Sequence, residues 1–284
     1  MSIAGLPRPI GYVLGGGGSL GAVQVGMLQA LSEHDLAPGI VAGASVGSLN
    51  GAVVALNPAS AANRLSHAWA KITRERVFPG GLLAQARLLQ HTKTHLFPAT
   101  GLAAVIADFI GTGATFEDLA LPFAAVATDI ATARPHVMRD GPLLPALLAS
   151  AAIPGIFPPV QLGSLQLYDG GLVANVPMRQ ALAMGARSLV VLDCNFPGHV
   201  PGPPATIAEV LFYTATVTMR GQAVLDAPVA AAEVPVIYLH GPEPRPLSPL
   251  DFRQTSLLIE TSYEAAGAFL ADLEVTGPGL YGSP

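Results

Sequence analysis

Four consecutive glycines, residues 15–18, separate a short apolar segment from a helix-like segment in GYVLGGGGSLGAVQVGMLQAL (11–31). Glycine loses more backbone freedom on folding than any other residue, so a run of four destabilises a chain unless the fold requires it. The run therefore predicts that another group approaches this backbone so closely that side chains are excluded. Its position predicts a tight turn between a strand and a helix.

Apolar strand-like segments alternate with helix-like segments along the chain, which is typical of an α/β protein with a mainly parallel sheet. There is no internal repeat or clear linker, so we expect one domain over residues 1–284. The segment 79–100 is the best candidate for an irregular insertion or lid. The expected strands are 10–14, 39–42, 122–130, 135–141, 165–171, 188–193 and, as the last, 234–240. The expected helices are 21–31, 46–56, 61–72, 142–152, 177–186 and 255–273.

The chain has few charged residues and many apolar ones. Only 12% of its 284 residues are charged and its mean hydropathy is +0.49, whereas about 25% are charged in an average protein. The net charge of -5 gives no electrostatic basis for a nucleic-acid partner. The single cysteine, Cys194, excludes an internal disulfide framework and a cysteine-cluster zinc site. No secretory signal or spanning segment is visible, so we expect a soluble, cytoplasmic protein that binds lipid, packs in an oligomer or has a small-residue interior.

A nucleophile-elbow pattern, G-x-S-x-G, occupies residues 43–47 with Ser45 at its centre. In such an elbow the serine sits on a sharp strand-to-helix turn, and Gly43 and Gly47 leave room where side chains would strike neighbouring elements. The helix that follows directs its N-terminal N–H groups at developing negative charge. A short apolar strand before the serine and a small-residue helix after it are the context that the pattern needs. Ser45 is therefore a candidate nucleophile.

The glycine run itself has two interpretations. Gly16, Gly18 and Gly21 fit the G-x-G-x-x-G pattern of a dinucleotide site, but the second strand, ending IVAGAS, lacks the acidic residue that binds the ribose. The alternative is an oxyanion hole, in which successive glycine N–H groups point into one cavity. Ser45 follows one βα unit later, so both loops leave the same edge of a parallel sheet. This convergence favours the oxyanion hole.

A serine nucleophile needs a base, and the residues offer two. Asp193 and His240 each end an expected strand and would complete a Ser-Asp-His triad with Ser45. Asp169, in LYDGGLVANVP, would instead form a dyad with Ser45. An Asp-Gly-Gly sequence is also typical of a plain turn, and a carboxylate is a weak base near neutrality unless burial raises its pKa. The residue pattern by itself leaves both arrangements open.

Three blocks in order, LGGGGSLGAVQVGMLQAL, VAGASVGSLNG and LYDGGLVANVP, resemble the patatin-like phospholipase family, in its bacterial branch. The likeness covers about residues 10–195. It implies a three-layer α/β/α fold with a mainly parallel central sheet, and a Ser-Asp dyad without histidine. It also implies that Ser45 is the nucleophile and Asp169 the general base. The supporting glycines would be Gly16, Gly17 and Gly18 in the oxyanion hole, with Gly21, Gly43, Gly47, Gly170 and Gly171 in the motifs.

The resemblance further implies lipase or phospholipase A-type hydrolysis of a lipid or long-chain ester through an acyl-enzyme, without metal or cofactor and with peripheral membrane contact. The apolar segment 143–157 is a candidate wall of the acyl pocket. One departure is Leu20, where the family often has Arg or Lys. Because this position carries no charge, one alternative is that the chain is a catalytically weak or silent relative that binds lipid. The other alternative is an esterase with the Ser45-Asp193-His240 triad.

Overall fold

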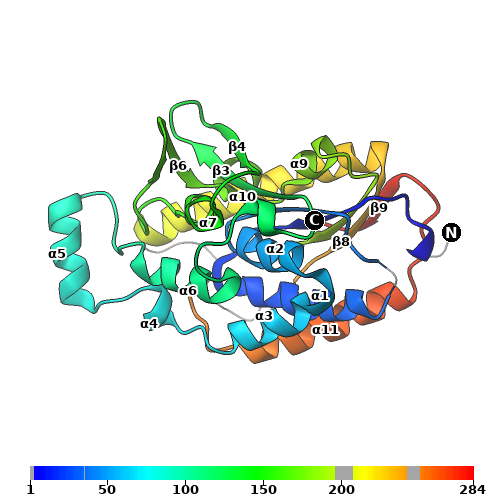
Figure 1. Ribbon diagram of the computed structural model, residues 1–284, viewed down its shortest axis with the longest axis horizontal. Helices are drawn as coiled ribbons and strands as arrows, with labels where there is room; N and C mark the ends of the chain where they lie inside the picture. Colours follow the sequence, from blue (N-terminus) through cyan, green and yellow to red (C-terminus); the bar gives the residue numbers. More distant parts are fainter. Residues whose placement is uncertain (1–2, 35, 196–206, 242–249) are drawn as a thin grey trace.

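A nine-stranded sheet forms the centre of the computed structural model, which describes residues 3–34, 36–195, 207–241 and 250–284 (Figure 1). The strand order is β5-β6-β3-β2-β1-β7-β8-β9, and β4 also pairs with β3. Strands β3, β2, β1, β7, β8 and β9 run parallel to one another, whereas β4, β5 and β6 pair antiparallel. The strands are β1 Ile10–Leu14, β2 Ile40–Ala44, β3 Phe123–Asp129, β4 Arg134–Met138, β5 Val160–Leu162, β6 Leu165–Asp169, β7 Ser188–Leu192, β8 Pro235–Leu239 and β9 Gly279–Gly282.

Helices cover both faces of the sheet (Figure 1). In Figure 1, α9 and α10 lie on one side of the sheet, and α1, α3 and α11 lie on the other. The helices are α1 Ala22–Ser32, α2 Val46–Leu56, α3 Ala61–Trp69, α4 Arg74–Val77, α5 Leu82–Thr92, α6 Thr100–Ile110, α7 Leu143–Ser150, α8 Gly171–Ala174, α9 Met178–Ala183, α10 Ile207–Glu233 and α11 Thr255–Ala271. Single turns of 3-10 helix occupy Ile3–Gly5, Gly18–Gly21, Pro58–Ser60 and Phe116–Asp118. This is the three-layer α/β/α arrangement expected from the sequence.

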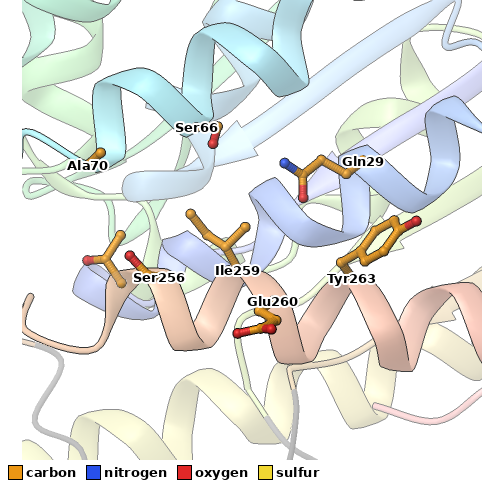
Figure 2. A pocket seen from close by; sticks show the side chains of 8 residues that line it. Gln29, Ser66, Ala70, Ser256, Ile259, Glu260 and Tyr263 are labelled. Carbon is orange, nitrogen blue, oxygen red and sulfur yellow. The ribbon is translucent and has the colours of Figure 1, made fainter.

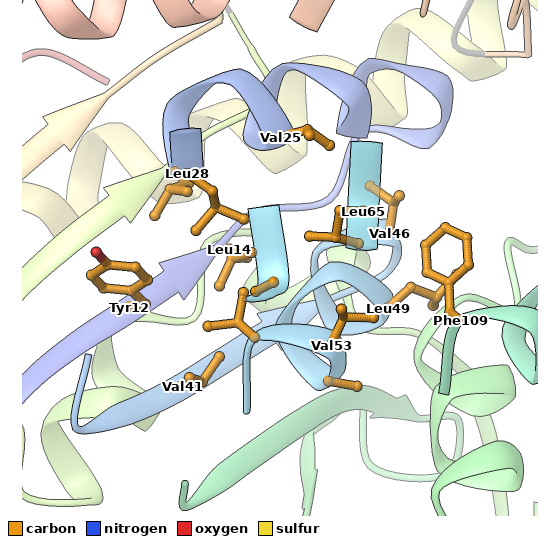
Figure 3. Packing of buried hydrophobic residues seen from close by; sticks show 14 of the residues in the cluster. Tyr12, Leu14, Val25, Leu28, Val41, Val46, Leu49, Val53, Leu65 and Phe109 are labelled. Atoms are coloured by element: carbon orange, nitrogen blue, oxygen red, sulfur yellow. The ribbon is translucent and has the colours of Figure 1, made fainter. Parts of the chain in front are cut away.

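The side chains of each central strand belong to two separate hydrophobic cores, one on each face of the sheet, because successive strand residues point to opposite faces. In β1, Tyr12 and Leu14 belong to the larger core, while Val13 belongs to the smaller core under α9 and α10. Figure 3 shows the larger core from close by, with Leu14, Val46, Leu65 and Phe109 among its members. All five residues of β1, β2, β7 and β8 are buried, so these strands read as continuous apolar runs.

Helix α2 lies deep between the sheet and other helices, with all residues from Val46 to Ala55 buried. Small residues make this packing close. A Cβ on Gly47 would lie 2.2 Å from the Leu14 carbonyl oxygen, so only glycine allows α2 to approach the end of β1 this closely. A Cβ on Gly43 would lie 2.4 Å from the Gly47 oxygen, so Gly43 and Gly47 are both needed at the elbow.

Two sequence-based expectations are wrong and one helix is missed, each for a local reason. Segment 79–100 is not irregular throughout, because α5 (Leu82–Thr92) lies within it. The strand at 234–240 is not the last, since β9 follows; two of its four residues are glycine, which hides its strand character. Helix α10 was not expected because its buried side consists largely of alanines, whereas Val217, Val224 and Leu225 are exposed. Its apolar pattern therefore does not mark its buried face.

Among the described residues, no helix is both long enough and apolar enough to cross a bilayer. The role of 79–100 as an insertion or a lid, the location of the protein in the cell and the single domain over 1–284 stay predictions.

Candidate active site

Ser45 is the single residue between the end of β2 and the start of α2. Its backbone has φ 53° and ψ −131°, a conformation that side-chain-bearing residues rarely adopt. Such strain persists only where the surrounding structure holds it, and it clusters at functional sites. The Ser45 N–H is 3.1 Å from Ser150 Oγ, which itself donates to the Val126 carbonyl oxygen. Ser150 was not a predicted site residue, and nothing in its sequence context, LLASAA, distinguishes it from a core serine.

Asp169 is the last residue of β6 and lies beside Ser45, although 124 positions separate the two in the sequence. The Ser45 hydroxyl donates to Asp169 Oδ2 at 2.6 Å. The other carboxylate oxygen, Oδ1, accepts from the Gly171 N–H at 2.7 Å. Thr128 Oγ1 donates to the Asp169 carbonyl oxygen, which fixes the backbone of this residue to β3. The predicted dyad residues are thus brought into direct contact.

Burial is the main influence on the Asp169 carboxyl, which is 1% exposed. Loss of solvent disfavours its charged form and raises its pKa to about 6, against the lowering effect of the Ser45 and Gly171 hydrogen bonds. A carboxylate with this pKa is a stronger base than an exposed one and is still largely ionised at neutral pH.

The glycine loop passes directly over the nucleophile. A Cβ on Gly16 would lie 3.0 Å from Ser45 Cβ and 2.5 Å from Asn175 Oδ1. A Cβ on Gly17 would lie 2.4 Å from Cys194 Cβ. The close approach that the glycine run predicts is therefore present, and the approaching groups include the side chains of Ser45, Asn175 and Cys194.

The four glycine N–H groups differ in their partners. Gly15 N–H donates to the Leu192 carbonyl oxygen, and Gly16 N–H donates to the Asn175 carbonyl oxygen at 3.1 Å. The place of Gly16 in the oxyanion hole stays a prediction, and in this structure its N–H is bound within the protein. Within the described part of the chain, no acceptor faces the N–H of Gly17 or Gly18.

Gly21 and Leu20 serve the packing of the loop. A Cβ on Gly21 would lie 2.5 Å from Val46 Cγ2, so this glycine lets the loop rest on α2. Leu20 is half-buried and packs against the larger core, and its N–H donates to the Gly17 carbonyl oxygen. Leu20 thus supports the loop with an apolar contact.

The alternative triad residues lie elsewhere along the sheet edge. Asp193 Oδ2 accepts from the Tyr238 hydroxyl at 2.6 Å, and its Oδ1 accepts from the backbone and side chain of Asn195. His240 Nδ1 lies 2.7 Å from the Gly241 carbonyl oxygen. The Ser45 hydroxyl donates its hydrogen bond to Asp169 and to neither of these residues.

An apolar cavity of about 70 Å³ opens on Ser45 and Gly18. Its remaining lining residues are apolar and come from α2, from α3, α4 and the residues directly after them, from α6, from the segment after α7 and from the residues before α11. Ala151, Ile153 and Phe157 are among them, so the segment 143–157 does contribute to the wall. The other lining residues are Val46, Leu49, Trp69, Ile72, Val77, Phe78, Leu102, Val105, Phe109, Leu250 and Phe252.

A larger hollow of about 340 Å³ lies between α1, α3 and α11, where Gln29, Ser66 and Tyr263 line it (Figure 2). It contains none of the predicted site residues. Among the described residues, no group of three His, Cys, Asp or Glu side chains is arranged to bind a metal. The cavity at Ser45 is therefore the candidate site.

Comparison with known proteins identifies the family of the chain. The family model described as patatin-like phospholipase matches residues 12–182. Patatin-like phospholipase domain-containing protein 7 of Mus musculus is 34% identical over 190 residues, covering 65% of this chain and 13% of the relative. An uncharacterized NTE family protein of Mycobacterium bovis is 31% identical over 199 residues, covering 69% of this chain and 51% of the relative.

The crystal structure of VipD from Legionella pneumophila is similar with 14% identity and a TM-score of 0.48, covering 95% of this chain and 69% of that one. The fold is α/β with a mainly parallel central sheet, and its candidate site pairs a serine in a strained backbone conformation with a buried aspartate. This chain belongs to the patatin-like phospholipase family. It spans only part of the relatives it matches, from about an eighth of the mouse protein to about half of the mycobacterial one.

Proposed function

We propose that this chain hydrolyses carboxylic esters of lipids, with Ser45 as nucleophile and Asp169 as general base. The observation that carries the proposal is the 2.6 Å hydrogen bond from Ser45 Oγ to Asp169 Oδ2 at the mouth of an apolar cavity. A hydroxyl with an adjacent base in a water-poor site is the arrangement that nucleophilic acyl transfer requires.

The reaction proceeds in two balanced halves. Ser45 Oγ attacks the ester carbonyl carbon while its proton passes to Asp169 Oδ2. The tetrahedral intermediate then breaks its bond to the alcohol oxygen, which takes the proton from Asp169, and an acyl-serine ester remains. Water attacks this ester and gives a proton to Asp169. Collapse of the second intermediate releases the fatty acid and returns the proton to Ser45 Oγ.

The N–H groups of Gly17 and Gly18 are the proposed oxyanion donors. They follow directly on the Gly16 peptide, whose own N–H is bound to Asn175, and Gly18 lines the cavity beside Ser45. One such donor contributes about 3–4 kcal/mol to the barrier reduction in measured cases of acyl transfer. The backbone donors do not depend on a cation at Leu20.

The substrate class follows from the cavity wall. Apart from Ser45 and Gly18, every lining residue has an apolar or aromatic side chain, so the cavity suits a hydrocarbon chain. Its volume of about 70 Å³ is far below the 300–1,000 Å³ or so that is typical of sites for drug-sized ligands. A long acyl chain therefore requires side chains such as Phe78 and Phe157, which stack on each other, to move apart.

Covalent labelling tests the proposal directly. A fluorophosphonate probe should label the protein at Ser45, identified by peptide mass spectrometry, because the serine is activated and the probe resembles the tetrahedral intermediate. Ser45→Ala should remove the label and lower p-nitrophenyl ester turnover by about 10⁴-fold or more, with an unchanged circular-dichroism spectrum. If a folded wild-type protein takes up no label, the chain is a silent lipid-binding relative.

The pH dependence provides a second test. Asp169 must be ionised to accept the proton, and its pKa is raised to about 6 by burial. We expect kcat/KM for a neutral ester to rise about tenfold per pH unit below about pH 6 and to level off above it. His240→Ala is the control, because His240 is the histidine of the alternative triad. The triad would be favoured if this variant lost the activity, whereas the dyad predicts an unchanged profile.

A further inference from the structure

Three buried polar side chains form a hydrogen-bonded chain beneath the glycine loop. They are Gln24 of α1, Asn50 of α2 and Trp69 of α3, each no more than 1% exposed. Trp69 Nε1 donates to Asn50 Oδ1 at 2.9 Å, and Asn50 Nδ2 donates to Gln24 Oε1 at 2.8 Å. Polar groups this deeply buried stabilise a structure only when their hydrogen bonds are made. Here each side-chain donor has an acceptor on the next residue of the chain of hydrogen bonds.

The chain ends on the backbone of the glycine loop. Gln24 Nε2 donates to the Gly15 carbonyl oxygen at 2.8 Å and to the Leu192 carbonyl oxygen at 3.0 Å. Asn50 Nδ2 also donates to the Gly21 carbonyl oxygen at 3.0 Å. The carbonyls of Gly15 and Gly21 flank residues 16–20, so the two amide side chains hold both ends of the segment that carries the proposed oxyanion donors.

Peptide planarity makes the contact at Gly15 especially informative. The Gly15 carbonyl and the Gly16 N–H belong to one rigid peptide plane. Gln24 binds this plane through its oxygen and Asn175 binds it through its N–H. With that plane held on both sides, only the φ and ψ rotations of Gly16 separate it from the peptide plane that carries the Gly17 N–H. Glycine backbones are otherwise the most mobile, so a loop of glycines needs such external contacts to be preorganised.

The opposite end of the chain lies at the acyl cavity. The Trp69 indole lines that cavity together with Gly18 and Ser45, and its ring packs against Phe109 and Phe252. A Cβ on Gly21 would lie 3.0 Å from Trp69 Cζ2, so the same ring also rests on the C-terminal end of the loop.

We propose that Gln24, Asn50 and Trp69 are positioning residues that set the direction of the Gly17 and Gly18 N–H groups, with Trp69 linking the acyl cavity to the glycine loop. The inference rests on the proposed hydrolase function. It identifies residues that touch neither the ester carbonyl nor the dyad and yet determine the rate of the acyl-transfer step.

The test compares two variants with a matched control. Gln24→Met keeps the side-chain length and removes both hydrogen bonds to backbone carbonyls. Trp69→Phe keeps an aromatic side chain at the cavity, removes the donor to Asn50 and makes the ring smaller. Ser262→Ala is the control, because Ser262 Oγ is buried and donates to the Val23 carbonyl oxygen of the same helix α1 but has no hydrogen bond to residues 15–21 among the described contacts. Each protein is assayed for melting temperature, fluorophosphonate labelling rate, and kcat and KM with p-nitrophenyl esters of short and long acyl chains.

Gln24→Met should lower kcat and the labelling rate together by about 100-fold, since misplacing a reacting group by about 1 Å costs that much. KM should change by less than about threefold, because the cavity is intact. Trp69→Phe should also lower kcat, and the factor should be the same for esters with short and with long acyl chains. Ser262→Ala should lose stability with kcat close to wild type.

Two results would overturn the inference. One is a folded Gln24→Met protein that labels at the wild-type rate. The other is a Trp69→Phe protein whose only change is a KM effect that grows with acyl length, which would make the indole a wall and nothing more. If Gln24→Met fails to fold, Trp69→Phe still decides the question. Absence of labelling in the wild-type protein would instead contradict the proposed function itself.

Discussion

Asp169→Asn should lower kcat for ester hydrolysis by about 10⁴-fold. The amide keeps the shape of the carboxyl group and can stay hydrogen-bonded to Ser45 and Gly171, but it cannot accept the serine proton. Steady-state kinetics with a p-nitrophenyl ester measures the effect, and the circular-dichroism spectrum checks the fold.

Asp193→Asn is the matched control for this variant. Asp193 is also a buried aspartate that follows a strand of the same sheet, but its carboxylate accepts from Tyr238 and Asn195. Its replacement should leave kcat within a few-fold of wild type. Full activity in Asp169→Asn, together with loss in Asp193→Asn, would replace the dyad by the triad.

The same Asp169→Asn substitution should stabilise the folded protein above pH 6. Burial raises the pKa of Asp169 to about 6 from an ordinary 3.8, so between these values the folded state retains a proton that the unfolded state has released. The free energy of unfolding should therefore fall as the pH rises from about 4 to 6, by about 3 kcal/mol, and Asp169→Asn should remove this decrease. Urea unfolding of both proteins at pH 4 and pH 7 measures the difference, which isolates Asp169 from other buried groups such as Asp193.

Gly47→Ala should destabilise the protein by about 3 kcal/mol or more and abolish labelling of Ser45. The new methyl group would lie 2.2 Å from the Leu14 oxygen and 2.6 Å from the Gly15 oxygen, so α2 must move away from β1 and from the glycine loop. Both the elbow and the oxyanion loop would shift.

Gly267→Ala in α11 is the control for this clash. A Cβ at Gly267 meets nothing within 4 Å, so the substitution should stabilise by up to about 1 kcal/mol through helix propensity alone. Thermal unfolding distinguishes the two variants. Equal melting temperatures for Gly47→Ala and wild type would contradict the close packing of α2 on β1.

Local patterns were sufficient for much of the fold because its central strands are short, continuous apolar runs. The expected strands at 10–14 and 188–193 correspond closely to β1 and β7. Helix α10 and strand β9 lack such a pattern. The buried side of α10 relies on alanine, and β9 gains its structure from pairing with β8, a contact over about forty residues of sequence.

The hydrogen-bond partners within the candidate site could be identified only from the tertiary structure. The sequence predicts that Gly16, Gly17 and Gly18 lie together in the oxyanion loop, whereas the structure shows the Asn175 carbonyl oxygen accepting from the Gly16 N–H. Gln24, Asn50 and Trp69 are unremarkable as residues of three successive helices. Their meaning appears only where the helices pack and the side chains meet.

The sequence by itself determined the strand-glycine-helix start, the elbow at Ser45 and the turn at Asp169, because each is encoded by a few adjacent residues with strict steric needs. Only the tertiary structure decided which base faces the serine, since the residues concerned are separated by more than a hundred positions. It also decided the raised pKa of Asp169, which depends on burial by distant segments. Short-range steric requirements depend on neighbouring residues, whereas burial and pairing across the sheet depend on the whole folded chain.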